Sequence, residues 1–258
     1  MKTLCFHLVV LLVLVSAIQC PQHHDPEAKT SDTIFQLSVL DALMAGIYNG
    51  AMSFGELRQY GNFGLGTFNA LDGEMVTVND TVYQIRADGT VCRIGNSDQT
   101  PFAVITFFTP DTVIRVGTTL IREQIEACID KALISPNIPV AIKITGFFEN
   151  VRTRSVPRQQ RPYPPLSDVL KTQPEFDIHS VYGTVVGFRL PLYMKNMNAP
   201  LYHFHFLTAD RSAGGHLLNC NGSDLRIELD YKHHLSLQLP RDEDFRNVNF
   251  QEIPGIYH

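Results

Sequence analysis

Three histidines stand close together in the segment PLYHFHFLTADRSAGGHLL, residues 200–218. His203 and His205 are two positions apart, and His216 follows eleven positions after His205. Alternate side chains of a β-strand share a face, so His203 and His205 would lie on one face, about 6 to 7 Å apart. The stretch ADRSAGG predicts a turn that returns His216 on the neighbouring strand. Three neutral imidazoles with an open fourth position are typical of a catalytic zinc site.

A polar, solvent-facing strand is the alternative explanation, and it is the commoner one for a His-x-His pair alone. The third histidine on a predicted return strand favours a metal site. Imidazole also binds nickel, copper and iron, so the pattern favours zinc without excluding these metals. His233 and His234 are adjacent and would point to opposite faces of a strand, so at most one can join the site. We assign both to the surface or to the surroundings of the site.

These histidines need a sheet to hold them, and residues 175–258 predict an antiparallel one. Its strands are expected at VYGTVVGFRLP, LYHFHFLTA, GGHLLNC and LRIELDY. The preceding half mixes helices and strands. Ser38 with Asp41 predicts the start of a first helix, and Gly46 its end. Further helices are predicted at 53–61 and 118–134, and strands at 75–79, 81–87, 102–108 and 140–156. The predicted fold class is α+β with two sheet-containing halves.

Glycine-rich and proline-rich segments divide this pattern. Residues 61–74, GNFGLGTFNALDGE, hold too many glycines for a regular element and lack the lysine of a phosphate-binding loop, so they predict a shaped loop. Residues 158–174 carry four prolines and are predicted to link the two halves. The expected order is a signal peptide over 1–17, extending at most to residue 20, an N-terminal α+β domain over 21–157, the linker, and a β-rich metal-binding domain over 175–258.

The N-terminal residues predict export. Lys2 precedes an apolar run of about ten residues, which is too short to span a bilayer, and Val15 and Ala17 suit cleavage after Ala17. We therefore expect a secreted protein without a membrane partner after cleavage. Export makes Asn79 and Asn221 candidate glycan acceptors, because each begins an Asn-X-Ser/Thr triplet.

The composition and the cysteine content further narrow the class of protein. The chain of 258 residues is 44% apolar, which is enough to bury a core, and its charge of −5 without a long basic run argues against a nucleic-acid partner. Four cysteines would remain after cleavage, and they allow three pairings if all form disulfides. They are Cys20, Cys92, Cys128 and Cys220. Cys128 shares the apolar stripe of a predicted helix and also fits a buried thiol.

The chain carries four long motifs in order: GNFGLGTFNALDGEM, TPFAVITFF, RTRSVPRQQRPYPPL and GTVVGFRLPLYMKNMNAPLYHFHFLTADRSAGGHLL. Together they resemble the successive motifs of the alpha-acetolactate decarboxylase family, from about Thr33 to about Leu239. The resemblance implies a two-domain α+β homodimer that binds zinc. It also implies the conversion of (S)-2-acetolactate to (R)-acetoin and carbon dioxide in acetoin biosynthesis. The family holds its metal with the HxH and GGH histidines, which are His203, His205 and His216 here.

The resemblance also implies site residues outside the histidine segment. The threonine and glutamate of the GTF-to-LDGE motif are Thr67 and Glu74, and the arginine of the R-S-V-P motif is Arg154. The family takes a further glutamate from its C-terminal tail. We expect the tail of this chain to be shorter than that of the family, with Glu252 as the candidate there.

The residue types fit this chemistry. Loss of carbon dioxide from a 2-hydroxy-3-keto acid leaves an enediolate, which a zinc ion can stabilise as a Lewis acid. The forked guanidinium of Arg154 suits a substrate carboxylate, although a surface ion pair is its default interpretation in isolation. Glu74 could orient a water or the substrate hydroxyl, donate the proton that completes acetoin, or merely cap a turn. Thr67 is expected to fix the loop or to bind substrate.

Two other classes of protein remain open. A secreted metal-binding module would keep the three histidines without the reaction, and another zinc lyase could use the same scaffold. A cupin would need a glutamate three or four residues after His205, where Thr208 and Ala209 stand. Metal content together with carbon dioxide release from acetolactate separates an enzyme from a binding module.

Overall fold

The structure is a computed structural model that describes residues 32–250. The predicted signal peptide and Cys20 lie outside the described residues, so export stays a prediction. Within the described part of the chain, no helix is long and apolar enough to cross a membrane. Cys92, Cys128 and Cys220 are free thiols, so the described residues contain no disulfide.

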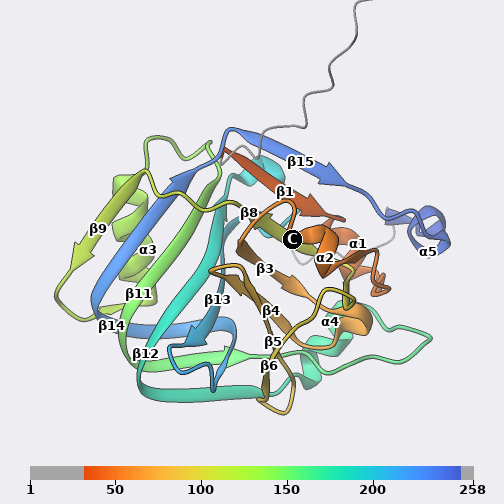
Figure 1. Cartoon of the computed structure of the whole chain (residues 1–258), viewed down its shortest axis with the longest axis horizontal. Helices are drawn as coiled ribbons and strands as arrows, with labels where there is room; N and C mark the ends of the chain where they lie inside the picture. Colours follow the sequence, from red (N-terminus) through yellow and green to blue (C-terminus); the bar gives the residue numbers. More distant parts are fainter. Residues whose placement is uncertain (1–31, 251–258) are drawn as a thin grey trace, which may run out of the picture.

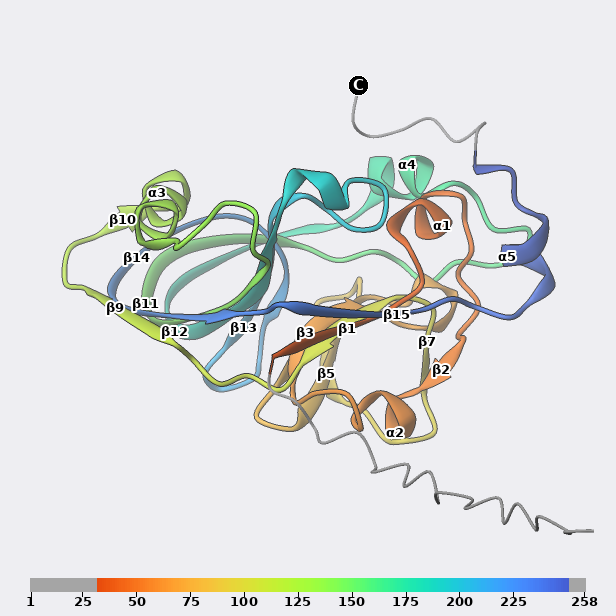
Figure 2. The same cartoon turned by 90° about the horizontal axis from the view of Figure 1, so that it is seen from above.

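A seven-stranded sheet is built mainly from the first part of the described chain. Its strands are β1 (Thr33–Leu37), β3 (Phe63–Thr67), β4 (Glu74–Val78), β5 (Thr81–Ile85), β6 (Val91–Arg93), β8 (Ala103–Thr106) and β15 (His234–Gln238). The strand order is β15-β1-β8-β3-β4-β5-β6. All neighbours are antiparallel except β1 and β15, which run parallel, side by side in Figure 2.

A second, wholly antiparallel sheet carries the histidines. Its strands are β9 (Thr112–Val116), β10 (Leu120–Ile121), β11 (Val140–Arg154), β12 (Glu175–Leu190), β13 (Leu201–Thr208) and β14 (Gly214–Tyr231). The order is β10-β14-β11-β12-β13, with β9 also paired to β14. Because β13 pairs with β12 on one side and with the first residues of β14 on the other, the sheet curls strongly (Figure 1).

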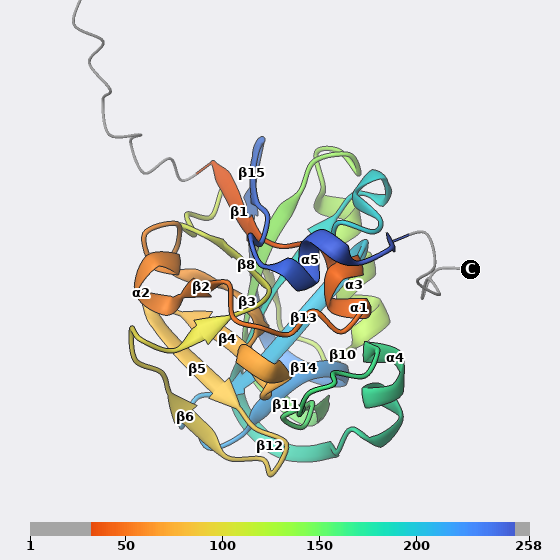
Figure 3. The same ribbon diagram turned by 90° about the vertical axis from the view of Figure 1, so that its right-hand side faces the viewer.

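Short helices cover the sheets. They are α1 (Leu40–Met44), α2 (Phe54–Leu57), α3 (Arg122–Ala132), α4 (Leu166–Val169), α5 (Glu243–Asn247) and the 3-10 turns η1 (Asn69–Leu71), η2 (Leu170–Thr172) and η3 (Leu192–Met194). A two-stranded ribbon joins β2 (Met52–Ser53) to β7 (Gln99–Thr100). Helix α3 packs on the outer face of the second sheet and α2 on the outer face of the first (Figure 2), while α1 and α4 are neighbours (Figure 3).

The main apolar core lies between the two sheets. It includes Leu65 of β3, Val76 of β4 and Phe188 of β12, all of which are at most 1% exposed, together with Leu43 of α1 and Leu166 of α4. Burying such a side chain is worth roughly 1.5 to 3 kcal/mol. The core therefore fixes β3 and β4 against the strands that carry the histidines.

The fold class is confirmed: the protein is α+β, with mostly antiparallel sheets. The glycine-rich segment 61–74 is not a loop throughout, because residues 63–67 form β3. A side chain at Gly64 or Gly66 would overlap the backbone at β8. Glycine at these two positions therefore allows β3 and β8 to approach closely. Helix α1 is present, but Val39 occupies its N-cap; Ser38 has a φ of 65° and makes no capping bond.

The division between the sheets differs from the predicted one. The proline-rich segment 158–174 connects β11 to β12, which are neighbours in the second sheet. The chain instead passes from the first sheet to the second at residues 107–111 and returns at residues 232–233. Proline content marks an irregular connection, whereas sheet membership is set by hydrogen bonds between strands distant in sequence.

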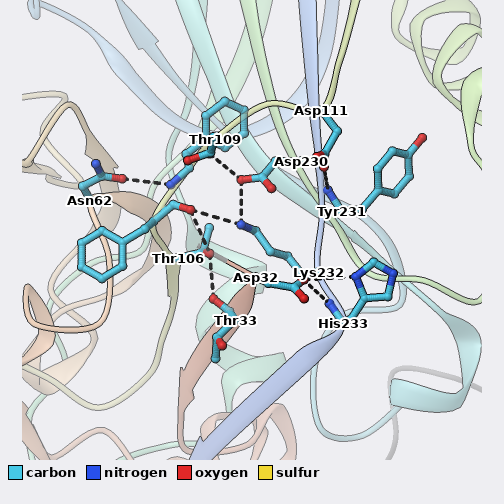
Figure 4. A network of polar contacts seen from close by, with 12 residues as sticks. Asp32, Thr33, Asn62, Thr106, Thr109, Asp111, Asp230, Tyr231, Lys232 and His233 are labelled. Carbon is cyan, nitrogen blue, oxygen red and sulfur yellow. Dashed lines mark hydrogen bonds and ion pairs between the residues drawn. The ribbon is translucent and has the colours of Figure 1, made fainter. Parts of the chain in front are cut away.

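A buried ion pair links the two segments, residues 107–111 and 232–233, at which the chain passes between the sheets (Figure 4). Lys232 Nζ lies 2.7 Å from Asp230 Oδ2 and donates to the Phe107 carbonyl at 3.1 Å. The same Asp230 oxygen accepts from the Thr109 backbone N–H at 2.7 Å. The Lys232 side chain is 0% exposed and that of Asp230 is 4% exposed. Burial raises the pKa of Asp230 to about 6, although Lys232 and the Thr109 hydrogen bond oppose this.

We expect Lys232→Met to lower the free energy of unfolding by about 3 to 5 kcal/mol, because it leaves the Asp230 carboxylate buried without its cation. Urea denaturation measures the loss. Lys171→Met is the matched control: Lys171 also lies 2.7 Å from its partner Asp168, but both side chains are more than half exposed. That change should cost at most about 1 kcal/mol. Equal losses in the two variants would show that the buried pair contributes no more than the surface pair.

Candidate metal centre and active site

The three predicted histidines converge. His203 and His205 share one face of β13, and His205 pairs directly across the strands with His216 of β14. Their ring centroids are 5.0 to 5.2 Å apart. One ligand atom from each ring lies within 4.8 Å of the others. This arrangement can close around one metal ion, as the sequence pattern predicted.

The ring nitrogens suit metal binding. His205 Nδ1 lies 2.7 Å from the Met75 carbonyl, to which it can only donate, so Nε2 is left as the lone-pair nitrogen. His203 Nδ1 is buried and has no hydrogen-bond partner in the protein. A buried ring nitrogen needs a partner for its lone pair, and a bound metal ion would be such a partner.

Burial and positive charge keep the imidazoles neutral. Burial is the main cause that lowers the pKa of His203 to about 3, with further effects of Arg154 and Arg122. Burial also holds the pKa values of His205 and His216 well below the ordinary value, and the guanidinium of Arg154 adds to this. Neutral imidazole is the form that ligates metals, so the site needs no proton release from histidine near neutral pH.

Glu74 and Arg154 complete the polar part of the site. Glu74 Oε1 accepts from Arg154 Nη1 at 2.9 Å, and Glu74 Oε2 lies 3.4 Å from His205 Nε2. Burial raises the pKa of Glu74 to about 7, although Arg154 opposes the rise. Arg154 is the last residue of β11 and pairs with His216 in the sheet. The first sheet thus supplies the glutamate, and the second supplies the arginine and the histidines.

Thr67 lies in the same place but has a structural contact. It pairs with Glu74 between β3 and β4, and its hydroxyl donates to the Gly73 carbonyl at 2.7 Å. Of the two roles expected for Thr67, this bond supports the fixing of the turn that precedes Glu74. Glu252 lies outside the described residues, and its role stays a prediction. His233 and His234 are exposed beside Asp32, away from the other histidines, as expected for surface residues.

A cavity of about 380 Å³ opens over these groups. Its polar lining consists of Thr67, Glu74, Arg154 and the three histidines, and Tyr202 also lines it. The remaining wall is apolar: Leu40, Leu43, Met44, Gly66, Leu71, Phe102, Val156, Leu166, Leu170, Ala199 and Pro200. Sequence reasoning missed this wall, because short apolar helices such as α1 and α4 carry no signal that separates cavity lining from core.

Known proteins resemble the chain over most of its length. The sequence model of the family described as alpha-acetolactate decarboxylase matches residues 34–252. The alpha-acetolactate decarboxylase of Methanosarcina mazei is 39% identical over 232 residues, covering 88% of this chain and 81% of that protein. That of Bacillus subtilis is 39% identical over 216 residues, covering 84% and 85%.

Solved structures agree with these sequence matches. The crystal structure of alpha-acetolactate decarboxylase from Bacillus subtilis strain 168 has a TM-score of 0.83 and 39% identity, over 84% of this chain and 93% of that one. A Staphylococcus aureus protein described as of unknown function and similar to alpha-acetolactate decarboxylase also has a TM-score of 0.83, at 27% identity. From the extent of these matches, the chain belongs to the alpha-acetolactate decarboxylase family.

Proposed function

We propose that this protein converts (S)-2-acetolactate to (R)-acetoin and carbon dioxide, with a zinc ion held by His203, His205 and His216. The observation that carries the proposal is the convergence of three neutral imidazoles with the Glu74–Arg154 pair in one small, largely apolar cavity. The names of the relatives support the substrate and the loss of carbon dioxide. The donor set, three imidazoles and an unpartnered His203 Nδ1, supports the metal.

The cavity suits a small hydroxy-keto acid. Its volume lies at the lower end of the range for small-molecule sites. The two methyl groups of acetolactate would contact the apolar wall from α1 and α4, which also excludes water. The polar substrate atoms would then face the histidines, Glu74 and Arg154. When bound, zinc supplies positive charge as a Lewis acid to the oxygens of the developing enediolate.

Arg154 would hold the substrate carboxylate. Its side chain is 15% exposed and lines the cavity, and Nη1 is bound to Glu74. The guanidinium carries five N–H donors, so it keeps donors for a second carboxylate while it contacts Glu74. In decarboxylation, the bond between this carboxyl carbon and the carbinol carbon breaks. The electron pair passes toward the adjacent carbonyl and forms the enediolate.

Glu74 would deliver the proton that completes acetoin. It lines the cavity and contacts both Arg154 and His205, and its pKa of about 7 allows it to carry a proton near neutral pH. Addition of one proton to the former carboxyl-bearing carbon balances the reaction and yields acetoin. A fixed side chain can deliver the proton to only one face of the planar enediolate, which accounts for the formation of a single enantiomer of acetoin.

An acetoin assay with and without a chelator tests this function. We expect the purified protein to release carbon dioxide and (R)-acetoin from (S)-2-acetolactate, to lose both activities after chelation, and to regain them with Zn²⁺. Metal binding without release of carbon dioxide would instead indicate the binding module. Activity that survives complete removal of metal would contradict the role of the histidines.

We also propose that the protein is an exported homodimer. The apolar N-terminal segment after Lys2 supports export. The edge strand β15 supports self-association, because it leaves Leu235 and Leu237 42% and 37% exposed. N-terminal sequencing of the secreted protein tests cleavage after Ala17, and sedimentation equilibrium tests the dimer through its molar mass.

A further inference from the structure

The strand that carries His216 is irregular directly behind the site. In the pairing of β14 with β11, Arg152 is opposite Asn219 and Thr153 is opposite Leu217, so Leu218 is an extra residue without a partner. Such a bulge bends a strand and re-aims the side chains next to it. The backbone carbonyl groups at the bulge also fall outside the regular hydrogen-bond pattern between the strands, so they need other hydrogen-bond donors.

Arg122 supplies those donors. It is the first residue of α3, and its Nη1 donates to the carbonyls of Leu217 at 3.0 Å and Leu218 at 2.8 Å. Its Nε donates to Glu126 Oε1 at 2.8 Å, which fixes the guanidinium from the other side. The side chains of Arg122 and Glu126 are each 24% exposed, so the group is largely shielded from solvent.

The same guanidinium reaches the other histidine strand. Its central carbon lies 5.9 Å from the ring centroid of Phe204, the residue between His203 and His205. Phe204 belongs to the apolar cluster under α3, on the face of β13 opposite the histidines. One side chain thus contacts β14 just after His216 and β13 between the two other histidines.

We propose that Arg122 is a positioning residue. It fixes the backbones of β13 and β14 from the α3 side, so that the imidazoles of His203, His205 and His216 stay directed at one metal position. The inference rests on the metal role proposed above. Arg122 touches neither substrate nor metal, because it lies on the α3 side of the sheet. Its effect is expected on metal affinity, since outer partners that orient ligands typically change this affinity by about 10- to 100-fold.

The experiment compares Zn²⁺ affinity of the chelator-stripped full chain and its variants by competition with a chromophoric chelator. We expect Arg122→Met to weaken Zn²⁺ binding by about 10- to 100-fold. Arg122→Lys keeps a donor and should restore part of the affinity. The visible spectrum of the Co²⁺-loaded Arg122→Met protein should shift, because ligand geometry sets that spectrum.

Arg152→Met is the matched control, because Arg152 lies on the same sheet but is 57% exposed and pairs with Glu175 at the surface. It should leave Zn²⁺ affinity unchanged. If Arg122→Met and Arg122→Lys both bind Zn²⁺ as tightly as the unaltered chain, the positioning role is overturned while the proposed function stands, even if melting of the metal-free protein shows lower stability. If the unaltered chain itself binds no Zn²⁺, the proposed function fails, and this inference fails with it.

Discussion

Replacement of His203 or His216 by alanine is expected to abolish both zinc binding and acetoin formation while the fold persists. Each change removes one of three imidazoles from the site. Loss of a Lewis acid worth several kcal/mol corresponds to a rate loss of about 10³-fold or more. The fold should survive, because the buried His203 Nδ1 makes no hydrogen bond within the protein. His205 is a poorer choice, since its Nδ1 also bonds the Met75 carbonyl of the other sheet.

Metal analysis of the dialysed variants, with the acetoin assay and a melting curve, measures these effects. His179→Ala is the control, because His179 is exposed on β12 and contacts Asn150 rather than the site. It should retain full metal content and activity. Full zinc occupancy in both His203→Ala and His216→Ala would rule out these residues as ligands.

Substitution of Glu74 by glutamine is expected to slow the reaction and to change its stereochemistry. Glutamine keeps the shape of the side chain but cannot deliver the proton, and general acid assistance is typically worth about 10² to 10⁴-fold. Carbon dioxide should still be released, because Arg154 and the metal remain. The enediolate would then take its proton from water on either face, so the product should drift from (R)-acetoin toward a racemate.

Chiral gas chromatography of the product, with carbon dioxide release measured in parallel, separates the two steps. Arg154→Lys is the comparison variant: it keeps the positive charge beside Glu74 but loses the fork, so it should lower kcat/KM and still give (R)-acetoin. Pure (R)-acetoin at an unchanged rate from Glu74→Gln would exclude Glu74 as the proton donor. A water held by Arg154, or a tail carboxylate such as Glu252, would then take that role.

The sequence by itself determined the local part of the site. Alternation along a strand is a property of the extended backbone, so His203 and His205 had to share a face wherever β13 packed. The turn before His216 was readable from ADRSAGG, because its small and polar residues favour tight turns. The long motifs also indicated Thr67, Glu74 and Arg154, since their order and spacing match one family over nearly the whole chain.

Only the tertiary structure decided how distant segments meet. Glu74 and Arg154 are 80 positions apart, yet their side chains are bound at 2.9 Å because β3 and β4 pack against the histidine sheet. The same packing placed β11 in the second sheet, returned β15 to the first, and set Arg122 behind the bulge at Leu218. Strand pairing and core packing are decided by the free energy of the whole fold, whereas composition and periodicity report only neighbours along the chain.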